Sequence, residues 1–165
     1  MSEHAFRLIK AKHADSAFSG EGARLVGGRW NLPGTPLIYT SETLSLAALE
    51  TFVHLQPVDK RIHYVWFRVT IPAGVAIDRQ ASLPASWRDS PPSEATQAIG
   101  TAWAKEMSSV ILQVPSTLVP GEYNLLLNPR HPQFKRLKIA KPEPFDFDGR
   151  LWKDGGAKKR PRTRK

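Results

Sequence analysis

The alternation of apolar and polar positions along the chain predicts a series of short β-strands. Residues 62–71 give the strongest strand pattern because β-branched and aromatic side chains dominate this segment. Similar but shorter runs predict further strands at residues 6–9, 37–40, 75–77, 110–114, 122–127 and 136–140. Proline residues between the later runs mark the turns that separate these strands.

Two segments instead repeat their apolar residues every three or four positions, as helices do. The first helix is predicted at residues 44–55, with Ser41 as its N-cap, and its broad apolar face predicts that it is mostly buried. Glu50 lies beside that apolar face. The second helix is predicted at residues 93–107, although Gly100 in its interior argues against one straight rod. This order of elements predicts an α+β fold with a twisted, mostly antiparallel sheet and two or three helices.

Residues 13–36 show neither pattern. Glycine and proline residues punctuate this segment, namely Gly20, Gly22, Gly27, Gly28, Pro33 and Gly34. A stretch of this length without periodicity inside a compact domain is usually functional or disordered. Because it ends in the pair Arg29-Trp30, whose side chains would be costly to leave unordered, we interpret it as a functional loop.

The composition narrows the classes of protein to which the chain can belong. Its 165 residues fit one domain with a sizeable core. The absence of cysteine excludes disulfide scaffolds, zinc–thiolate sites and thiol nucleophiles. The chain has neither a signal peptide pattern nor an apolar run of about 20 residues, so we expect a cytoplasmic protein without membrane contact.

The formal net charge of +9 is typical of nucleic-acid binders. Eight of the 24 basic residues and one of the 15 acidic residues, however, lie in residues 150–165, which leaves +2 for residues 1–149. The charge therefore predicts a nearly neutral domain at 1–149 followed by a basic tail. Since the tail has few apolar residues, we expect it to be disordered and to contact polyanions weakly.

Several catalytic motifs are missing from the chain. Neither a Walker loop nor a dinucleotide-binding loop is present, because no Gly-Lys-Ser/Thr and no G-x-G-x-x-G sequence occurs. The nucleophile elbow of α/β-hydrolases is absent as well. The five histidines lack the spacing of metal ligands, so we expect no metal site.

Three residues within 22 positions carry candidate chemistry. Arg29 follows two glycines, so its guanidinium could bind a phosphate, or it could lie on the surface stacked on Trp30. Tyr39 ends a predicted strand, where its ring could stack on a planar ligand or pack in the core. Glu50 could stabilise positive charge on a sugar or hold a ribose hydroxyl, or it could be a solvated helix residue. The three together are more specific than any one alone.

Ser116 is a fourth candidate, because it follows the predicted strand at 110–114. Its hydroxyl could donate a hydrogen bond to a phosphate or hydroxyl of a ligand, or it could cap a turn. Turn chemistry alone explains Asn124, Asn128 and His131, although an exposed His131 could also assist at a site.

Several blocks of the sequence resemble the RES domain, a family named for an Arg, a Glu and a Ser. The blocks are Gly27-Gly28-Arg29-Trp30-Asn31, Ile38-Tyr39-Thr40-Ser41, Ser45-Leu46-Ala47-Ala48-Leu49-Glu50, Val114-Pro115-Ser116, Glu122-Tyr123-Asn124-Leu125-Leu126-Leu127-Asn128-Pro129 and His131-Pro132. They occur in order within about residues 5–142, so the resemblance is specific. It matches the three residues of the family name to Arg29, Glu50 and Ser116.

The resemblance implies a fold similar to ADP-ribosyltransferases and the role of toxin in a RES–Xre toxin–antitoxin pair. It also implies NAD⁺ as the substrate and cleavage of its nicotinamide–ribose bond, which depletes NAD⁺ by hydrolysis or phosphorolysis without a cofactor or metal. The implied partner is an Xre-type helix-turn-helix antitoxin, and the resemblance allows a homodimer within that complex. The implied catalytic residues are Glu50, Arg29 and Tyr39, and the implied substrate-binding residues are Arg29, Tyr39, Ser116 and Trp30.

Two other functions stay open on the sequence alone. Some relatives transfer ADP-ribose to a protein, which the same fold and site would support. Alternatively, the chain could be a non-enzymatic nucleic-acid or interaction module that acts through its basic tail. The nearly neutral charge of residues 1–149 argues against this last function as the main activity.

Overall fold

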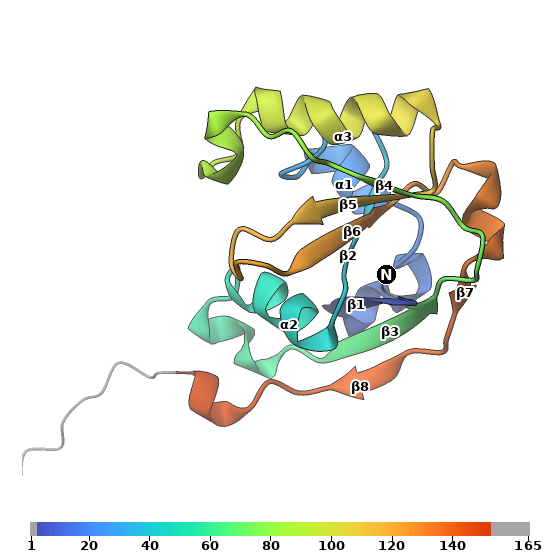
Figure 1. Ribbon diagram of the computed structural model, residues 1–165. Helices are drawn as coiled ribbons and strands as arrows, with labels where there is room; N and C mark the ends of the chain where they lie inside the picture. Colours follow the sequence, from blue (N-terminus) through green and yellow to red (C-terminus); the bar gives the residue numbers. More distant parts are fainter. Residues whose placement is uncertain (1–2, 153–165) are drawn as a thin grey trace, which may run out of the picture.

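Eight strands form one curled sheet in the computed structural model, which describes residues 3–152 (Figure 1). The strands are β1 (His4–Lys10), β2 (Ile38–Ser41), β3 (Tyr64–Thr70), β4 (Ile77–Arg79), β5 (Ile111–Pro115), β6 (Tyr123–Leu127), β7 (Lys138–Ile139) and β8 (Glu143–Phe145). Their order is β4-β5-β6-β2-β1-β3-β7, and β8 also pairs with β3. All of these pairs are antiparallel except β4 with β5, which confirms the predicted α+β fold with a mostly antiparallel sheet.

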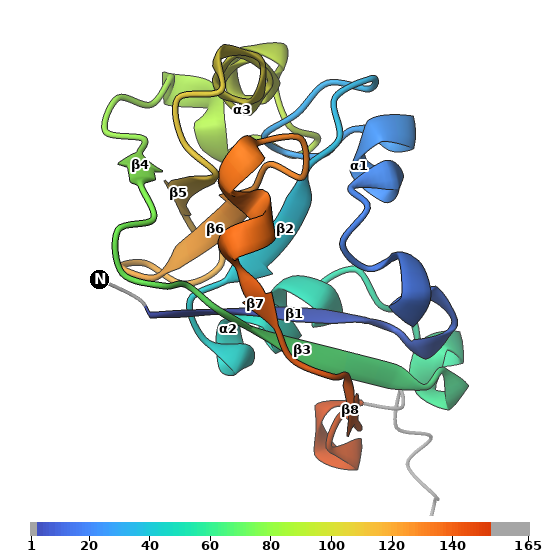
Figure 2. The same cartoon turned by 90° about the vertical axis from the view of Figure 1, so that its right-hand side faces the viewer.

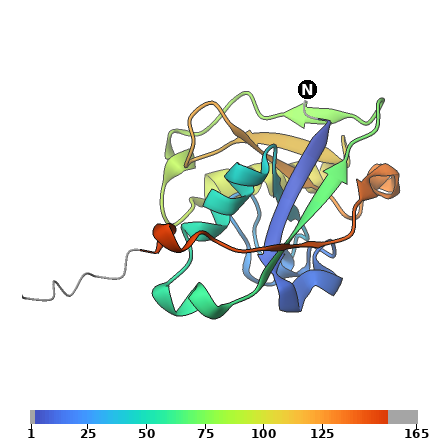
Figure 3. The same ribbon diagram turned by 90° about the horizontal axis from the view of Figure 1, so that it is seen from below.

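Three α-helices accompany the sheet within residues 3–152, as predicted. They are α1 (Glu21–Val26), α2 (Leu44–Phe52) and α3 (Glu94–Glu106). The first of them lies inside the predicted loop at 13–36, where its six residues are too few to show a helical period. Helix α3 covers the half of the sheet that holds β5 and β6, whereas α2 lies beside β1 at the other half (Figures 1, 2 and 3).

The core is divided between the two faces of the sheet. On β6 the side chains of Leu125 and Leu127 pack inside the curl of the sheet against Ile38. Leu126, between them, points to the opposite face and packs beneath α3 with Trp103. Both faces of this strand are therefore buried, which explains why its sequence is a continuous apolar run rather than an alternating one.

Helix α2 differs from its prediction in two respects. Its N-cap is Thr43, whose side-chain Oγ1 accepts a hydrogen bond from the Leu46 backbone N–H at 3.0 Å, so the assignment of Ser41 as N-cap is wrong. The helix is also less buried than its apolar face predicts, since Leu49 is 46% exposed. Ser41 instead ends β2, where its side chain faces the site described below.

Gly100 allows α3 to lie directly on the backbone of a distant segment. A β-carbon at this position would overlap the carbonyl oxygen of Trp30, and α3 continues through the glycine without a break. We expect Gly100→Ala to lower the free energy of unfolding by about 3 kcal/mol because of this overlap. The higher helix propensity of alanine alone would have the opposite effect and raise stability. Gly22→Ala, in α1, is the control because a β-carbon there meets no atom within 4 Å. Chemical denaturation of both variants measures the difference, and equal stabilities would contradict the overlap.

The chain after β8 returns to α2 before it leaves the described part of the structure. A 3₁₀ helix at Gly149–Leu151 precedes Trp152, whose ring centroid lies 5.0 Å from that of Phe52. The folded region thus extends to Trp152, three residues beyond the predicted boundary. The rest of the predicted tail, residues 153–165, lies outside the described residues, so its disorder and its polyanion contacts stay predictions. Within residues 3–152, no helix is both long enough and apolar enough to span a membrane.

Candidate active site

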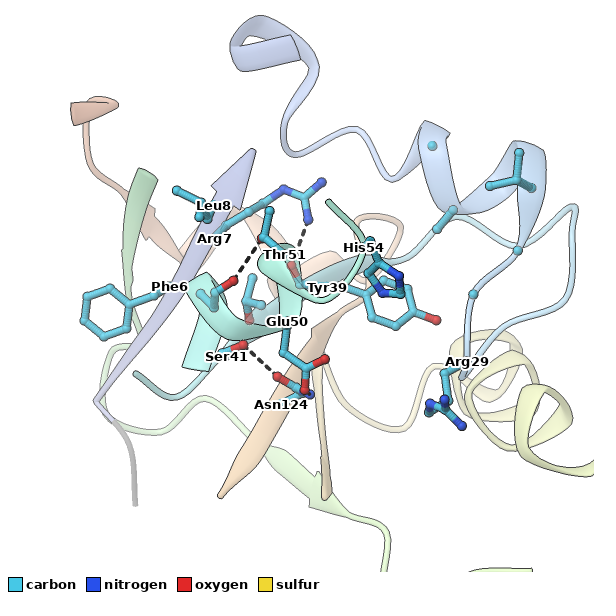
Figure 4. A pocket seen from close by; sticks show the side chains of 17 residues that line it. Phe6, Arg7, Leu8, Arg29, Tyr39, Ser41, Glu50, Thr51, His54 and Asn124 are labelled. Atoms are coloured by element: carbon cyan, nitrogen blue, oxygen red, sulfur yellow. Dashed lines mark hydrogen bonds between the residues drawn. The ribbon is translucent and has the colours of Figure 1, made fainter. Parts of the chain in front are cut away.

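The sheet opens between β1 and β2, although these strands are neighbours. Their paired position is Phe6↔Ser41, and beyond it a side chain replaces the ladder, since Arg7 Nη1 donates to the carbonyl oxygen of Tyr39 at 2.7 Å. A cavity of about 430 Å³ lies at this opening, lined by residues of β1, β2, α2, β6 and the segment from α1 to Arg29 (Figure 4). This volume falls within the range of about 300–1,000 Å³ that small-molecule sites occupy.

Glu50 projects from the last turn of α2 into this cavity (Figure 4). Its Oε1 accepts two hydrogen bonds, from Ser116 Oγ at 2.9 Å and from Asn124 Nδ2 at 2.7 Å. Within residues 3–152, no group donates a hydrogen bond to its other oxygen, Oε2. One oxygen of the carboxylate is therefore fixed by the protein, and the other is available to a ligand.

Arg7 brings a positive charge to the same cavity from β1. Its Nη1 bonds to Tyr39, but its Nε is buried without a hydrogen-bond partner among the described residues. Burial lowers the pKa of Arg7 to about 10, which leaves the guanidinium charged at neutral pH. Our sequence reasoning missed this residue, although one signal was present: Arg7 is the single charge inside the apolar run at 6–9.

The side chain of Tyr39 lines the cavity with its ring, while its hydroxyl is held in the structure. Its Oη accepts a hydrogen bond from the Trp30 backbone N–H at 3.0 Å and donates to Asn31 Oδ1 at 2.7 Å. Burial raises the pKa of the Tyr39 phenol, so the hydroxyl keeps its proton at neutral pH. Trp30 itself is only 2% exposed, packs in the core beneath α3 and does not line the cavity.

Removal of the Tyr39 hydroxyl should cost stability more than it changes the cavity. In Tyr39→Phe the Trp30 N–H and the fully buried Asn31 Oδ1 lose their partner, so we expect a loss of about 2 kcal/mol in the free energy of unfolding. Tyr123→Phe, at an exposed position, is the matched control and should change stability by less than about 0.5 kcal/mol. Thermal unfolding of the two variants measures the difference, and a Tyr39→Phe variant as stable as the control would refute this role.

Arg29 lies at the rim of the cavity, at a distance from Arg7 across the ring of Tyr39 (Figure 4). Its Nη1 donates to the carbonyl oxygens of Trp87 and Asp89, at 2.9 and 2.8 Å, in and just after a 3₁₀ helix at Ala85–Arg88. Among the described residues Arg29 makes no cation–π contact to Trp30, so the predicted surface stacking is wrong. Nη1 of Arg29 thus holds the segment at Trp87–Asp89 in place, and the other nitrogens of the guanidinium can face a ligand.

Ser116 lies beside Glu50, as the predicted trio of Arg, Glu and Ser requires. The residue is only 2% exposed, and its hydroxyl donates its proton to Glu50. The same oxygen accepts hydrogen bonds from the backbone N–H groups of Leu118 and Val119. This geometry makes Ser116 a holder of the carboxylate, and its predicted contact with substrate stays a prediction.

The three residues that we assigned to turns have different outcomes. Asn128 donates to the carbonyl oxygen of Ala104, and His131 caps the 3₁₀ helix at Pro132–Arg136, so both have structural roles. Asn124 instead lines the cavity and contacts Glu50, which the sequence did not predict. Within residues 3–152, no group of three or more His, Asp or Glu side chains could hold a metal ion.

The structure combines a curled α+β sheet with a cavity that holds one carboxylate and two guanidinium groups. Comparisons with known proteins identify both the fold and the family of the chain. A chain of the M. tuberculosis MbcT–MbcA toxin–antitoxin complex has the same fold, with a TM-score of 0.68 at 20% sequence identity over 88% of this chain and 85% of that chain. The chain belongs to the RES domain family, which matches residues 4–148. The resemblance drawn from the sequence is therefore confirmed.

Relatives from three bacteria show the same family over most of their length. The chain is 40% identical over 148 residues to "Toxin Res" of Yersinia enterocolitica, which covers 88% of this chain and 97% of the relative. It is 37% identical over 150 residues to "Toxin Res" of Photorhabdus laumondii, with 90% and 96% covered. It is 34% identical over 137 residues to "Prs ADP-ribosylating toxin" of Sphingobium sp., with 81% and 85% covered.

Proposed function

We propose that this chain is the toxin of a toxin–antitoxin pair and that it cleaves the nicotinamide–ribose bond of NAD⁺ in the cavity between β1, β2 and α2. The observation that carries this proposal is the Glu50 carboxylate, which lines the cavity with Oε1 held by two donors and with no donor to Oε2 among residues 3–152. Relatives named as toxins support the role of toxin. The relative named as an ADP-ribosylating toxin supports the chemistry, since ADP-ribosylation breaks the same bond.

The carboxylate suits the charge that this reaction creates. When the bond between ribose C1′ and the nicotinamide nitrogen breaks, its electron pair leaves with the nicotinamide, which becomes neutral. The ribose is then left with a positive charge shared by C1′ and the ring oxygen. Glu50 Oε2 would stabilise this charge, which is largest in the transition state, so its effect would fall mainly on the rate of cleavage.

The guanidinium groups suit the other half of the substrate. Arg7 and Arg29 both line the cavity and, within residues 3–152, neither forms an ion pair with a carboxylate. A pyrophosphate would give them the negative partner that the protein does not supply. The ring of Tyr39 lies between them, where it would form one wall for the nicotinamide or the ribose.

The molecule that accepts the ADP-ribose group distinguishes two candidate functions. In the proposed function water or phosphate attacks C1′, and NAD⁺ is depleted. The second candidate function is transfer to a protein, which two adjacent exposed apolar residues of α1 favour. Leu25 and Val26 are 62% and 79% exposed, and Val26 lines the cavity. A protein acceptor could pack on these side chains.

The partner that we propose is an Xre-type helix-turn-helix antitoxin in the cytoplasm, with a homodimer of the toxin as one arrangement in the complex. The structural neighbour comes from a toxin–antitoxin complex, which supports a protein partner. Co-expression with the protein encoded by the adjacent reading frame tests this proposal. Co-purification and loss of toxicity are the expected results.

Incubation of the purified chain with NAD⁺ labelled in the adenosine half tests the reaction. We expect free nicotinamide together with labelled ADP-ribose in water, or labelled ADP-ribose 1″-phosphate when phosphate is added. Label on a protein band would favour the second candidate function. The non-enzymatic alternative predicts no nicotinamide release at all, and salt-sensitive polyanion binding that disappears when residues 153–165 are deleted.

A further inference from the structure

Ser41 and Asn124 face each other across two antiparallel strands, at the inner end of the cavity. They are a directly opposed pair in the register of β2 and β6, and both line the cavity. Ser41 is only 3% exposed, and its Oγ donates a hydrogen bond to Asn124 Oδ1 at 2.6 Å (Figure 4). The backbone pairing therefore holds both side chains in place before any ligand binds.

Glu50 and Ser41 together orient the Asn124 amide. Because the Glu50 carboxylate only accepts hydrogen bonds, the amide nitrogen faces its Oε1 at 2.7 Å, and the amide oxygen then accepts the Ser41 proton. The flipped amide would place its oxygen against the carboxylate oxygen with no hydrogen between them. The orientation of the amide is thus set by its two neighbours together.

We propose that Ser41 and Asn124 are positioning residues for Glu50, and this inference rests on the function proposed above. Asn124 and Ser116 both bind Oε1, so the carboxylate cannot rotate without the loss of two hydrogen bonds. Because Glu50 lines the cavity, its Oε2, which accepts no hydrogen bond from residues 3–152, is left for a ligand. Ser41 is one hydrogen bond further from Glu50 than Asn124 is. It does not need to contact the substrate, because it acts on Glu50 through the Asn124 amide.

A pair of variants with the same shape tests this role. Ser41→Thr keeps the hydroxyl, and Ser41→Val replaces it with a methyl group, so any cost of the larger side chain is common to both. We expect Ser41→Val to have a kcat for nicotinamide release about 10- to 100-fold below that of Ser41→Thr, since small displacements of a reacting group cost rates of this order. The KM for NAD⁺ should stay within about twofold between the two variants. Equal kcat values would overturn the proposal.

A second variant covers the case in which position 41 does not accept a larger side chain. Asn124→Leu has nearly the size of asparagine but no N–H to donate, and it adds no charge beside Glu50. We expect its kcat to fall at least as far as that of Ser41→Val, in a protein that still unfolds cooperatively. A folded Asn124→Leu variant with wild-type kcat would also overturn the proposal.

A spectroscopic measurement separates this inference from the proposed function. The side-chain N–H₂ signals of Asn124 in a ¹⁵N-correlated NMR spectrum should move in Glu50→Gln and in Ser41→Val, and should stay near their wild-type positions in Ser41→Thr. If the wild-type protein released no nicotinamide, the proposed function would fail. These changes in chemical shift would still show whether Ser41, Asn124 and Glu50 are linked by hydrogen bonds. If the Asn124 signals moved in neither Glu50→Gln nor Ser41→Val, the hydrogen bonds that link Ser41, Asn124 and Glu50 would not exist in solution.

Discussion

Glu50→Gln is expected to release nicotinamide from NAD⁺ about 10²- to 10³-fold more slowly than the wild-type chain. Glutamine has the shape of glutamate and still offers an oxygen to Ser116 Oγ and Asn124 Nδ2, so we expect the fold to be kept. It carries no negative charge, however, and cannot stabilise the positive charge on the ribose. The loss should appear in kcat, whereas the KM for NAD⁺ should change little because the contacts to the phosphates are untouched.

The control for this variant is a carboxylate far from the cavity. Glu106 is exposed at the end of α3 and does not line the cavity, so Glu106→Gln should retain wild-type activity. Single-turnover release of nicotinamide and the Tm should be measured for both variants. A Glu50→Gln variant that keeps the wild-type Tm and the wild-type rate would show that the carboxylate has no part in the reaction.

The sequence predicted the part of the site that is local in the chain. Arg29, Tyr39 and Glu50 lie within 22 positions, on consecutive elements, and the structure brings all three to one cavity. Arg7 and Asn124 were missed because they reach the cavity from β1 and β6, through strand pairing that no local pattern reveals. Such long-range placement depends on the order of strands in the sheet.

The same division holds for the fold. Helix α3 was predicted to within one residue at each end because Ser93 caps it, with its side chain accepting from the Thr96 backbone N–H. The burial of α2 was wrong because its apolar period says only that one face is apolar, whereas the sheet leaves part of that face uncovered. Strand β8 was missed, since Pro144 lies within its three residues and hides the pattern.

Among the predicted site residues, Trp30 is the clearest case of a residue that was expected to bind a ligand and instead packs in the core. The resemblance implied that Trp30 binds substrate, but its ring fills the core beneath α3 and its backbone N–H donates to the Tyr39 hydroxyl. The glycine that permits this packing, Gly100, lies 70 positions away. Trp30 therefore anchors its segment in the core and helps to hold the Tyr39 hydroxyl in position.

Arg7→Met is expected to lower activity and to raise stability. Methionine removes the positive charge that would hold a phosphate of NAD⁺, so we expect kcat/KM to fall about 10- to 100-fold, mostly through a higher KM. Methionine also removes a buried Nε that has no partner among the described residues. We therefore expect the free energy of unfolding to rise by about 1 kcal/mol, despite the lost bond to the Tyr39 carbonyl. Arg68→Met, at an exposed position of β3, is the control and should change neither quantity.

The pH dependence of stability gives the same prediction a second, independent measurement. Burial lowers the pKa of Arg7 to about 10, below the pKa of an arginine in the unfolded chain, so the charged guanidinium destabilises the folded chain until it loses its proton. Above about pH 10 the unfolded chain keeps this proton while the folded chain has lost it, so the contribution of Arg7 to the stability of the wild-type chain rises with pH. The advantage of Arg7→Met should thus be constant below about pH 10 and shrink above it. Urea unfolding at pH 7, 9 and 10.5 measures this difference. An Arg7→Met variant that is less stable at each pH and has the wild-type KM would mean that the guanidinium serves the fold alone.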